Sequence, residues 1–557
     1  MQIAPLSQRQ RFGSGFLAGL AAGIIATVLM LLVSVAFNGI SLPEVFGSAL
    51  TQLMSPSMFD TLHRIIGGDA KYYFFYCILV GQCLVFALTG GLYTLIAGMV
   101  KPEQAGEIQG QLRWRTGMLL AFLLWLIVGL VFLPLTGAGL FGAQLVIGAL
   151  NTTVSLALVG IAFGSLFVYM QNWLALRCLR IQSGLSKEEL EEKGLSRRVV
   201  LQRSIELVGL GVIGVLAWRF ITSASGMGGV SSGNVPSSQL IQRFQKKIVP
   251  PPTPNYADIQ QVQFLSKEVT SNDQYYIVSK NLFNDPSVNG DTWRLNVQGE
   301  IEHPFSFSYK ELLDLPRKQQ YESMMCISNE VGGQYMSNAL WEGIPLADLL
   351  ARGGAIKPGA SKVVLYAADD YSDSIHLSKA LEPTTLLALR MNGQTLPQGH
   401  GFPLRLLVPG IYGMKHVKWI TRIEVVNTDF QGYWQQRSWS DPAPIRMTSR
   451  IDTPLTGSTL QADRPTYIAG VAFSGNKGIS QVDVSFDAGQ TWNKAALKRP
   501  LSALTWVLWE LPWQPKAGSY TVIVRAIDME GNVQDPHEAP PLPDGSSGYH
   551  GIDITAK

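Results

Sequence analysis

Long stretches of this sequence carry no charged side chain, and they constrain its fold more than any other feature. Residues 72–100 and residues 116–176 contain no Asp, Glu, Lys or Arg. A globular core does not require such runs, whereas about 20 consecutive apolar residues are needed to cross the hydrocarbon core of a bilayer. The sequence therefore predicts a membrane region at the N-terminal end.

We predict about five membrane spans within residues 1–222. The first is rich in glycine and alanine, which suits close helix packing in lipid. The second uncharged stretch divides into two spans near Pro134 and Gly142. The predicted spans are residues 14–37, 72–100, 117–133, 153–174 and the shorter run 207–218.

The distribution of Lys and Arg predicts the orientation of these spans, because basic loops stay in the cytoplasm. Basic residues precede the first span, separate the second from the third, and number seven between the fourth and the fifth. The other two loops hold only Arg64 and Lys71. We therefore expect a multi-pass protein of the bacterial cytoplasmic membrane, with its N-terminus inside and its later residues on the extracytoplasmic side.

A short motif before the fifth span bears on export. Residues 196–201 read SRRVVL, which resembles a twin-arginine signal. Such a signal suits a domain that folds around a cofactor before it crosses the membrane, although two arginines at a helix start also serve as an ordinary positive-inside anchor. Cleavage near residues 223–224 stays open. His63 is the only histidine before residue 300, so we expect no haem bound within this region.

The rest of the chain divides by composition. Residues 223–262 are rich in Ser, Gly and Pro and predict a linker. Residues 263–450 alternate strand-like and helical runs, with buried strands at 363–367 and 404–408 and a helix entry at 340–351, which predicts a mixed α/β domain. Residues 451–557 alternate apolar and polar side chains between regular turns, which predicts an immunoglobulin-like β-sandwich.

The overall charge gives no sign of a nucleic-acid partner. The 44 Lys and Arg nearly balance the 41 Asp and Glu, and no basic patch or acidic tail stands out. We therefore expect the membrane and a small-molecule substrate as partners, and no nucleic acid.

Cys326 is the only cysteine after Cys178, so the soluble part has no internal disulfide. A basic, glycine-rich stretch follows it at residues 400–419. Thiolate is a soft metal ligand, and cationic side chains among backbone amides bind phosphate. The two segments therefore indicate a soft metal on an anionic carrier. The competing interpretation is an inert cysteine that packs as a small hydrophobic residue.

Together the two segments resemble the sulfite oxidase family of molybdopterin enzymes. The likeness covers residues 275–528 and includes His400-Gly401-Phe402-Pro403, Arg405, Val408-Pro409-Gly410 and His416-Val417-Lys418-Trp419. It implies a Mo–molybdopterin cofactor whose metal is bound by Cys326, the catalytic ligand, for two-electron oxygen-atom transfer. It also implies that cationic donors neutralise the pterin phosphate. The implied cofactor contacts are Ser279, Lys280, Asn281, Asp369 or Asp370, His400, Arg405, His416, Val417 and Lys418.

Two positions depart from the family's pattern. Sulfite oxidases have an arginine where Ser279 stands, which receives the anionic substrate, and a tyrosine beside the metal where Trp439 stands. Losing a charge-assisted donor costs on the order of 2–3 kcal/mol. We therefore expect an S-oxide or an N-oxide rather than sulfite, with the direction of the reaction left open.

The resemblance also implies partners. Its C-terminal domain implies a homodimer, and without haem in this chain the electrons need an external partner, either a quinone-linked protein or a cytochrome. The nearer likeness is to membrane-attached bacterial members of the superfamily. The alternative is a non-catalytic membrane receptor or assembly protein on the same fold.

Overall fold

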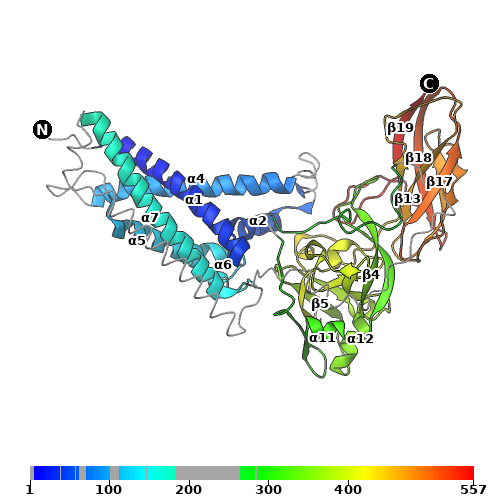
Figure 1. Ribbon diagram of the computed structural model, residues 1–557, viewed down its shortest axis with the longest axis horizontal. Coiled ribbons are helices and arrows are strands. Elements are labelled where there is room, and N and C mark those ends of the chain that lie inside the picture. Colours follow the sequence, from blue (N-terminus) through cyan, green and yellow to red (C-terminus); the bar gives the residue numbers. More distant parts are fainter. Residues whose placement is uncertain are drawn as a thin grey trace. The chain divides into compact units, whose positions relative to one another are not determined.

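The computed structural model describes residues 6–37, 39–56, 58–59, 61, 70–100, 112–145, 147–183, 264–282 and 285–557. The chain forms two compact units (Figure 1). The first, called the helical unit here, comprises Met1–Thr51, Ile66–Gly233 and Asn281–Asn284. The second, called the sheet unit, comprises Gln52–Ile65, Asn234–Lys280 and Asp285–Lys557.

Four helices of the helical unit are long and apolar enough to cross a membrane, counting only the described residues. They are α1 (Gln8–Phe37), α4 (Ala70–Val100), the run that begins with α5 (Trp114–Ile127), and α7 (Gly148–Ser183). These helices coincide with four of the five predicted spans and are compatible with them. The fifth prediction, at 207–218, falls outside the described residues, as do the twin-arginine motif and the linker. A further helix, α2 (Leu42–Leu53), was not predicted.

The third span is longer than predicted and changes its winding near its end. After α5 the chain passes through a π-helical turn, η1 (Val128–Phe132), and ends in α6 (Leu133–Leu135). The N–H of Leu133 bonds to the carbonyl of Val128. Pro134 lacks an N–H and its ring crowds the preceding turn, so the wider turn accommodates it without breaking the helix. A 3₁₀ turn, η2 (Leu140–Gly142), leads on toward α7.

Glycines bring α1 and α4 into close contact. A Cβ at Gly15 would lie 2.5 Å from the carbonyl oxygen of Gly90, and one at Gly19 would lie 2.5 Å from that of Phe86. Gly23 packs on the Phe86 ring in the same way. The three glycines are four residues apart and share one helix face, so the backbones approach as small residues allow in membrane helices.

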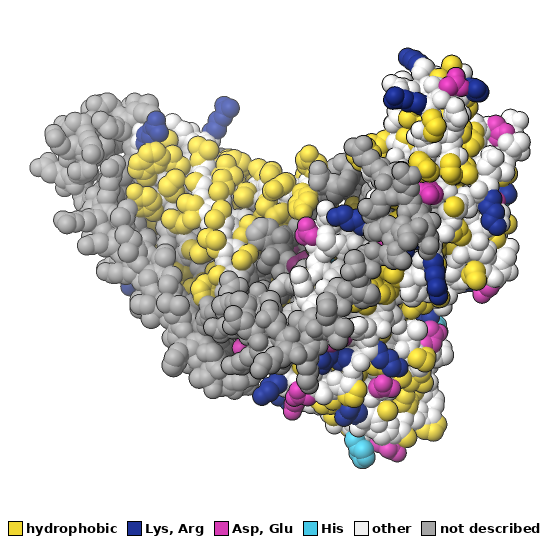
Figure 2. Space-filling model, turned by 45° about the vertical axis from the view of Figure 1, so that its right-hand side comes forward, with side chains coloured by type: hydrophobic (Ala, Val, Ile, Leu, Met, Phe, Trp, Pro, Cys, Tyr) yellow, Lys and Arg dark blue, Asp and Glu magenta, His cyan; other side chains and the backbone are white. Residues whose placement is uncertain are grey.

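The outer faces of these helices remain apolar. Leu17, Ile24 and Val28 of α1 and Val80 and Leu88 of α4 are all about half exposed or more. Figure 2 shows hydrophobic side chains covering the visible face of the helices. A contiguous apolar surface of this kind is unusual for a soluble monomer. The four helices are therefore compatible with a membrane anchor.

The first part of the sheet unit holds two five-stranded sheets, which agrees with the predicted mixed α/β domain. One sheet has the order β2-β1-β10-β5-β6, in which β1 and β10 are parallel and the other pairs antiparallel. Its strands are β1 (Arg294–Gly299), β2 (Phe305–Ser308), β5 (Lys362–Ala367), β6 (Ser372–His376) and β10 (Ile420–Val426).

The second sheet is antiparallel, with the order β3-β4-β7-β8 and with β9 also paired to β7. Its strands are β3 (Lys318–Met325), β4 (Met336–Pro345), β7 (Leu386–Met391), β8 (Gln394–Thr395) and β9 (Arg405–Leu407). Short helices connect the strands: α11 (Tyr309–Leu313), α12 (Leu346–Leu350) and α13 (Leu377–Ala380). The predicted buried strands at 363–367 and 404–408 correspond to β5 and β9.

The predicted helix entry at 340–351 was wrong in its first half. Every residue of β4 is buried between β3 and β7, and the helix α12 begins only at Leu346. Residues that are buried on both faces give a continuous apolar run, which periodicity cannot distinguish from a buried helix. Pairing with two neighbouring strands decided the structure here.

The last part of the chain forms two further sheets around one core. One sheet has the order β11-β13-β17-β16 and the other β12-β19-β18-β14-β15. Ile468 and Trp509 of the first sheet and Val484, Val524 and Ile554 of the second belong to the same buried cluster. The immunoglobulin-like topology stays a prediction. The strands are β11 (Thr448–Thr453), β12 (Thr459–Leu460), β13 (Thr466–Phe473), β14 (Ile479–Ser485), β15 (Asn493–Lys494), β16 (Ala496–Leu497), β17 (Val507–Trp513), β18 (Gly518–Asp528) and β19 (His550–Ala556).

Candidate functional site

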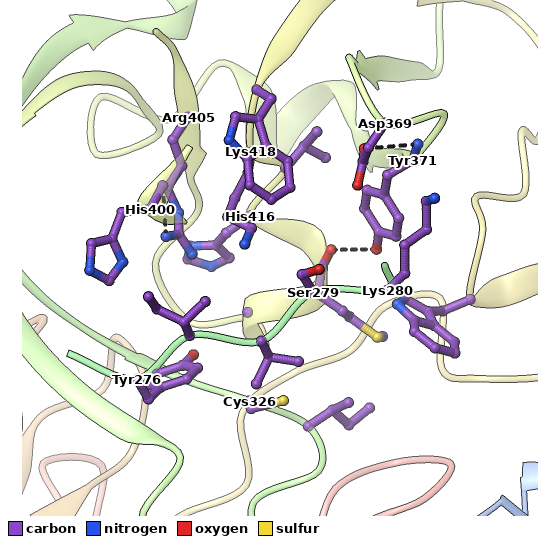
Figure 3. A pocket seen from close by; sticks show the side chains of 18 of the residues that line it. Tyr276, Ser279, Lys280, Cys326, Asp369, Tyr371, His400, Arg405, His416 and Lys418 are labelled. Carbon is purple, nitrogen blue, oxygen red and sulfur yellow. Dashed lines mark hydrogen bonds between the residues drawn. The ribbon is translucent and has the colours of Figure 1, made fainter. Parts of the chain in front are cut away.

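A pocket in the sheet unit gathers most of the predicted site residues. Its empty volume is about 770 Å³, including the part that is open to solvent. Figure 3 shows side chains from separate segments of the chain around one hollow. The predicted residues that line it are Ser279, Lys280, Cys326, Asp369, His400, Arg405, His416, Val417 and Lys418.

Two of the predicted cofactor contacts do not line this pocket. Asn281 is buried but is not among the lining residues, and Asp370 is exposed with a φ of 63°. Of the two neighbouring aspartates that the sequence left open, only Asp369 reaches the pocket. A left-handed backbone at Asp370 turns the chain between β5 and β6, which places consecutive side chains on different sides.

Cys326 follows directly after β3, whose last residue is Met325. Its N–H bonds to the carbonyl of Tyr335 at 2.9 Å, and its carbonyl accepts the N–H of Asn329 at 3.1 Å, so the turn fixes its backbone. Burial raises the pKa of its thiol, although hydrogen bonds from Ser328 and Ile327 work in the opposite direction. A bound metal ion would favour the thiolate.

Within the described residues, no group of three or more His, Cys, Asp or Glu side chains is placed to hold a metal ion. The sequence implied a metal at Cys326 on an anionic carrier. The protein's own donor set fits that arrangement, because one soft thiolate stands beside groups that bind an anion.

Arg405 is a buried cation, and no carboxylate of the described residues forms an ion pair with it. One guanidinium nitrogen donates to the carbonyl of His400 at 3.1 Å, and another lies 2.8 Å from the sulfur of Met324. The Nε atom has no hydrogen-bond partner among the described residues. A buried charge is costly unless it is compensated, so this position favours an anionic ligand.

Burial favours the neutral form of both histidines of the motif. Burial lowers the pKa of His400 to about 4 and that of His416 to about 3. Their Nε2 atoms face the carbonyls of Asn272 at 2.8 Å and Ile411 at 3.1 Å. A carbonyl only accepts, so each Nε2 carries the hydrogen and each Nδ1 is an acceptor.

A buried carboxyl group lies beside one of these histidines. Glu322 Oε1 is 4.0 Å from His416 Nδ1, and Gln320 donates to Glu322 Oε2 at 2.8 Å. Burial raises the pKa of Glu322 to about 8. The carboxyl group is therefore mainly protonated at neutral pH and faces a neutral imidazole. The cationic donors that line the pocket are Arg405, Lys418 and Lys280.

Gly401 allows the backbone segments that carry Lys418 and Arg405 to lie close together. Its φ is 116°, and an added Cβ would lie 3.0 Å from the Cβ of Lys418 and 3.2 Å from that of Arg405. A larger residue would be strained in this conformation. The Nζ of Lys418 donates to the carbonyl of Gly399 at 3.1 Å and lies 4.0 Å from the Trp419 ring centroid.

The opposite wall of the pocket is polar near Ser279 and aromatic elsewhere. Ser279 donates to Asp285 at 2.5 Å, and Lys280 lies 5.5 Å from the ring centroid of Tyr433. Trp439 lines the pocket, as the departure noted in the sequence implied, and it stacks on Trp434 with 4.1 Å between ring centroids.

Sequence reasoning missed several pocket residues, among them Tyr276, Tyr371 and Met414. Tyr276 is half-buried, with its hydroxyl oxygen inside, and burial, with the nearby Cys326 second, raises the pKa of that hydroxyl above its usual value. A signal was present in the sequence, since Tyr371 directly follows the two aspartates that were singled out. The spacing of apolar residues does not reveal Tyr371 as a pocket residue, because the turn between β5 and β6 decides where its side chain lies.

Comparison with known proteins gives two matching family models. Residues 283–434 match the "Oxidoreductase molybdopterin binding domain", and residues 443–540 match the "Mo-co oxidoreductase dimerisation domain". The first match includes Cys326 and the motif from His400 to Trp419.

Curated relatives match a little under half of the chain. The mitochondrial sulfite oxidase of Homo sapiens is 33% identical over 303 residues, which is 46% of this chain and 55% of that protein. The sulfite oxidase of Arabidopsis thaliana is 31% identical over 44% of this chain and 76% of that protein. The NADH nitrate reductase of Cichorium intybus is 27% identical over 45% of this chain and 34% of that protein. The chain thus spans only about half the length of the first of these relatives.

Among solved structures, the sulfane dehydrogenase SoxCD from Paracoccus pantotrophus aligns with 49% of this chain and 78% of that chain. The sequence identity is 23% and the TM-score is 0.43.

Proposed function

The chain belongs to the sulfite oxidase family of molybdopterin oxidoreductases, and from this premise we propose that it catalyses two-electron oxygen-atom transfer at a molybdenum centre. The proposal rests on one observation: the thiol of Cys326 and the buried guanidinium of Arg405, which has no ion-pair partner among the described residues, line the same pocket.

In this proposal Cys326 is the protein's ligand to the metal. Arg405, Lys418 and Lys280 neutralise the anionic carrier, and the Nδ1 atoms of the neutral His400 and His416 accept hydrogen bonds. Ser279, Asp369 and Val417 complete the contacts. When bound, Mo–molybdopterin supplies the two-electron change, while the protein orients the carrier and excludes water.

The substrate in this proposal is a small S-oxide or N-oxide. Ser279 stands where the family's arginine would receive sulfite, and Asp285 accepts its hydroxyl at 2.5 Å, which adds negative charge at that place. The aromatic pair Trp434 and Trp439 offers an apolar wall instead. A neutral oxide suits this wall better than a dianion does.

We further propose that the four described apolar helices, with a fifth span, anchor the catalytic domain on the extracytoplasmic side of a bacterial cytoplasmic membrane. The twin-arginine motif at 196–201 supports export of a folded domain. An immunoglobulin-like C-terminal domain forms a homodimer, which the match to a dimerisation domain supports. A quinone-linked protein or a cytochrome exchanges the electrons.

Metal and pterin analysis tests the central proposal. The purified full-length protein, from cells that make the cofactor, is expected to hold about one molybdenum and one pterin per chain. Cys326→Ala is expected to lose the metal, while Cys178→Ala serves as a control that keeps it. Protein free of metal and pterin, with Cys326 open to alkylation, would support the alternative of a non-catalytic receptor or assembly protein.

A substrate screen then tests the reaction. We expect reduced viologen dye to be oxidised with S-oxides or N-oxides, and little activity with sulfite and an oxidised dye. Sulfite oxidation as the fastest reaction would contradict the assignment of the substrate, though not that of the cofactor.

A further inference from the structure

The turn that carries Cys326 joins β3 to β4 and contains two adjacent glycines. Gly332 has a φ of 74°, and the N–H of Gly333 bonds to the carbonyl of Glu330 at 2.9 Å. Glycine has more backbone freedom than any other residue, so a turn of this composition is loose unless other parts of the fold hold it. We call residues 326–335 the cysteine loop.

One contact to the cysteine loop comes from Arg450 of β11, in the C-terminal sheets. A terminal guanidinium nitrogen donates to the carbonyl of Gly333 at 2.7 Å. The other terminal nitrogen donates to the Ser266 hydroxyl at 2.9 Å, and Nε donates to Asp452 at 2.6 Å. The side chains of Arg450 and Asp452 are both 4% exposed. Asp452 and Ser266 therefore fix the guanidinium, which directs one nitrogen at the loop.

A second contact comes from the segment before β19. The Ser546 hydroxyl donates to the carbonyl of Asn329 at 2.7 Å. The N–H of Asn329 in turn donates to the carbonyl of Cys326 at 3.1 Å, and its side-chain oxygen accepts the N–H of Tyr335 at 2.8 Å. A single residue thus stands between Ser546 and the backbone of the cysteine.

A third contact is steric and involves His550, the first residue of β19. A Cβ added at Gly332 would collide with Cδ2 and Nε2 of the His550 ring, so the loop approaches the ring as only glycine allows. The Nδ1 of His550 accepts the N–H of Ile451 at 3.0 Å, which fixes the ring to β11. The C-terminal sheets thus contact the cysteine loop at three of its residues.

These three contacts act on the backbone of the loop, whereas the thiol of Cys326 lies among the residues that line the pocket (Figure 3). The N–H and the carbonyl of Cys326 are both bonded within the loop, to Tyr335 and Asn329. Holding these two groups fixes the direction of the Cα–Cβ bond and limits the positions of the sulfur. Groups behind a metal ligand commonly orient it and tune the metal in this way.

We propose that Arg450 and Ser546 are positioning residues for Cys326, through which the C-terminal sheets set the direction of the metal-binding thiolate. The region that matches a dimerisation domain includes Arg450 and so takes part in the redox site as well. The role toward a metal rests on the proposed function, whereas the restraint of the cysteine loop does not.

Alkylation of Cys326 tests the restraint in full-length protein from cells that do not make the cofactor. Iodoacetamide labelling is followed by mass spectrometry of the peptide that contains Cys326, which separates it from the other three cysteines. We expect Ser546→Ala to be labelled roughly 3- to 10-fold faster than the wild type, as the loss of one neutral hydrogen bond allows, and Arg450→Gln roughly 10-fold faster or more.

The neighbouring serine provides a matched control. The Ser547 hydroxyl donates to the carbonyl of His537 at 2.7 Å and not to the cysteine loop, so Ser547→Ala should be labelled at the wild-type rate. Ser546→Thr keeps the hydroxyl and should also be labelled at that rate. Equal labelling of Cys326 in Ser546→Ala and Ser547→Ala overturns the proposal.

The control for the arginine is Arg525→Gln. Arg525 pairs with Asp483 at 3.1 Å in the same C-terminal sheets, so its loss measures the effect of removing an ion pair away from the loop. Cys326 in this variant should be labelled at the wild-type rate. Should Arg450→Gln fail to fold because Asp452 loses its ion pair, Ser546→Ala decides alone.

Electron paramagnetic resonance of the molybdenum-loaded protein tests the direction of the thiolate. The signal of molybdenum(V) depends on the orientation of its sulfur ligand and not on the overall stability of the protein. We expect a shifted signal in Ser546→Ala and an unchanged signal in Ser547→Ala and Ser546→Thr. Faster labelling with an unchanged signal would show that Ser546 holds the loop without orienting the ligand, and it would overturn the proposal.

The two measurements separate this proposal from the proposed function. A protein that takes up no molybdenum would contradict the function, while the labelling of Cys326 would still decide whether Arg450 and Ser546 hold the cysteine loop. A molybdenum-containing protein whose variants are labelled like the wild type would contradict only the proposal made here.

Discussion

Burial sets the charge of individual residues in the pocket, and it separates neighbours within one motif. His400 and Arg405 are five residues apart, and burial lowers the pKa of both, that of the histidine to about 4. Only the arginine keeps its proton at neutral pH. The difference is intrinsic, because a guanidinium starts from a far higher pKa than an imidazole does. The pocket therefore combines fixed cations with neutral acceptors.

Glu322 gives a testable pH dependence at this scale. Its pKa rises from 4.5 to about 8 on folding, so the folded protein holds a proton that the unfolded chain releases. The stabilisation is complete below pH 4.5 and is lost as pH rises toward about 8. We expect thermal midpoints of cofactor-free protein to fall over this range, and to fall less in Glu322→Gln.

His400 and His416 contribute the opposite trend, since their depressed pKa values make stability decrease as the pH falls below 6.5. The wild type and Glu322→Gln share this contribution, so the difference between their thermal midpoints reports on Glu322 alone. A difference that does not change between pH 5 and pH 8 would show that Glu322 is ionised in the folded protein.

Ser279 offers a second prediction. Restoring an arginine here should favour sulfite, but Asp285 lies within reach and would pair with the new charge. We therefore expect little gain from Ser279→Arg alone and a larger gain from Ser279→Arg combined with Asp285→Asn. A charge-assisted donor contributes about 1.5–3 kcal/mol, so kcat/KM for sulfite should rise on the order of tenfold or more. Equal effects in the single and double variants would contradict the role given to Asp285.

At the scale of elements, close packing of backbones decides where glycine is required. Gly15, Gly19 and Gly23 lie on the face of α1 that meets α4, and an added Cβ would collide with backbone or ring atoms there. Gly81 of α4 has no atom within 4 Å of an added Cβ. The packing therefore requires glycine at the three positions of α1, whereas a larger residue would fit at Gly81.

Alanine substitutions at Gly81 and at Gly19 should therefore change stability in opposite directions. Alanine is favoured over glycine in a helix by about 1 kcal/mol, so Gly81→Ala should leave stability unchanged or raise it. Gly19→Ala places a Cβ 2.5 Å from the Phe86 carbonyl oxygen, and such overpacking costs about 1–3 kcal/mol. Thermal midpoints in detergent would measure both, and equal shifts would contradict the packing described for α1 and α4.

At the scale of the whole molecule, buried polar contacts join the two domains of the sheet unit. Lys498 pairs with Glu268 at 2.6 Å, and both side chains are almost fully buried. The backbone carbonyl of Glu268 accepts the indole N–H of Trp506 at 3.0 Å, and Ser323 accepts the N–H of Trp506 at 2.8 Å. These contacts couple the pterin-binding sheets to the last two sheets.

Lys498→Met should destabilise the sheet unit by about 3–5 kcal/mol, because it leaves a buried carboxylate without its ion-pair partner. Adding Glu268→Gln should recover most of that loss. Lys516→Met is the control, since its pair with Asp463 is 80% and 62% exposed and contributes at most about 1 kcal/mol. Denaturant unfolding followed by tryptophan fluorescence would test all three. No recovery in the double variant would show that Lys498 acts through packing instead.

Local features carried much of the sequence prediction. The uncharged runs at 72–100 and 116–176 predicted three of the four apolar helices, and the glycine- and alanine-rich run at 14–37 predicted the first, because lipid tolerates few other patterns. The motif from His400 to Trp419 indicated the family. Alternating side chains predicted strands after residue 451, since a half-buried strand repeats every two residues. These signals are short in range, so the sequence alone contains them.

Only the tertiary structure decided the rest. It made β4 a strand where the apolar run predicted a helix, it chose Asp369 over Asp370, and it made both motif histidines neutral. It also brought Asp373 of β6 next to Lys415, and Lys415 next to Asp441, although these residues are far apart in the chain. Burial and pairing depend on residues far apart in the chain, and no local pattern records how completely a side chain loses its contact with water.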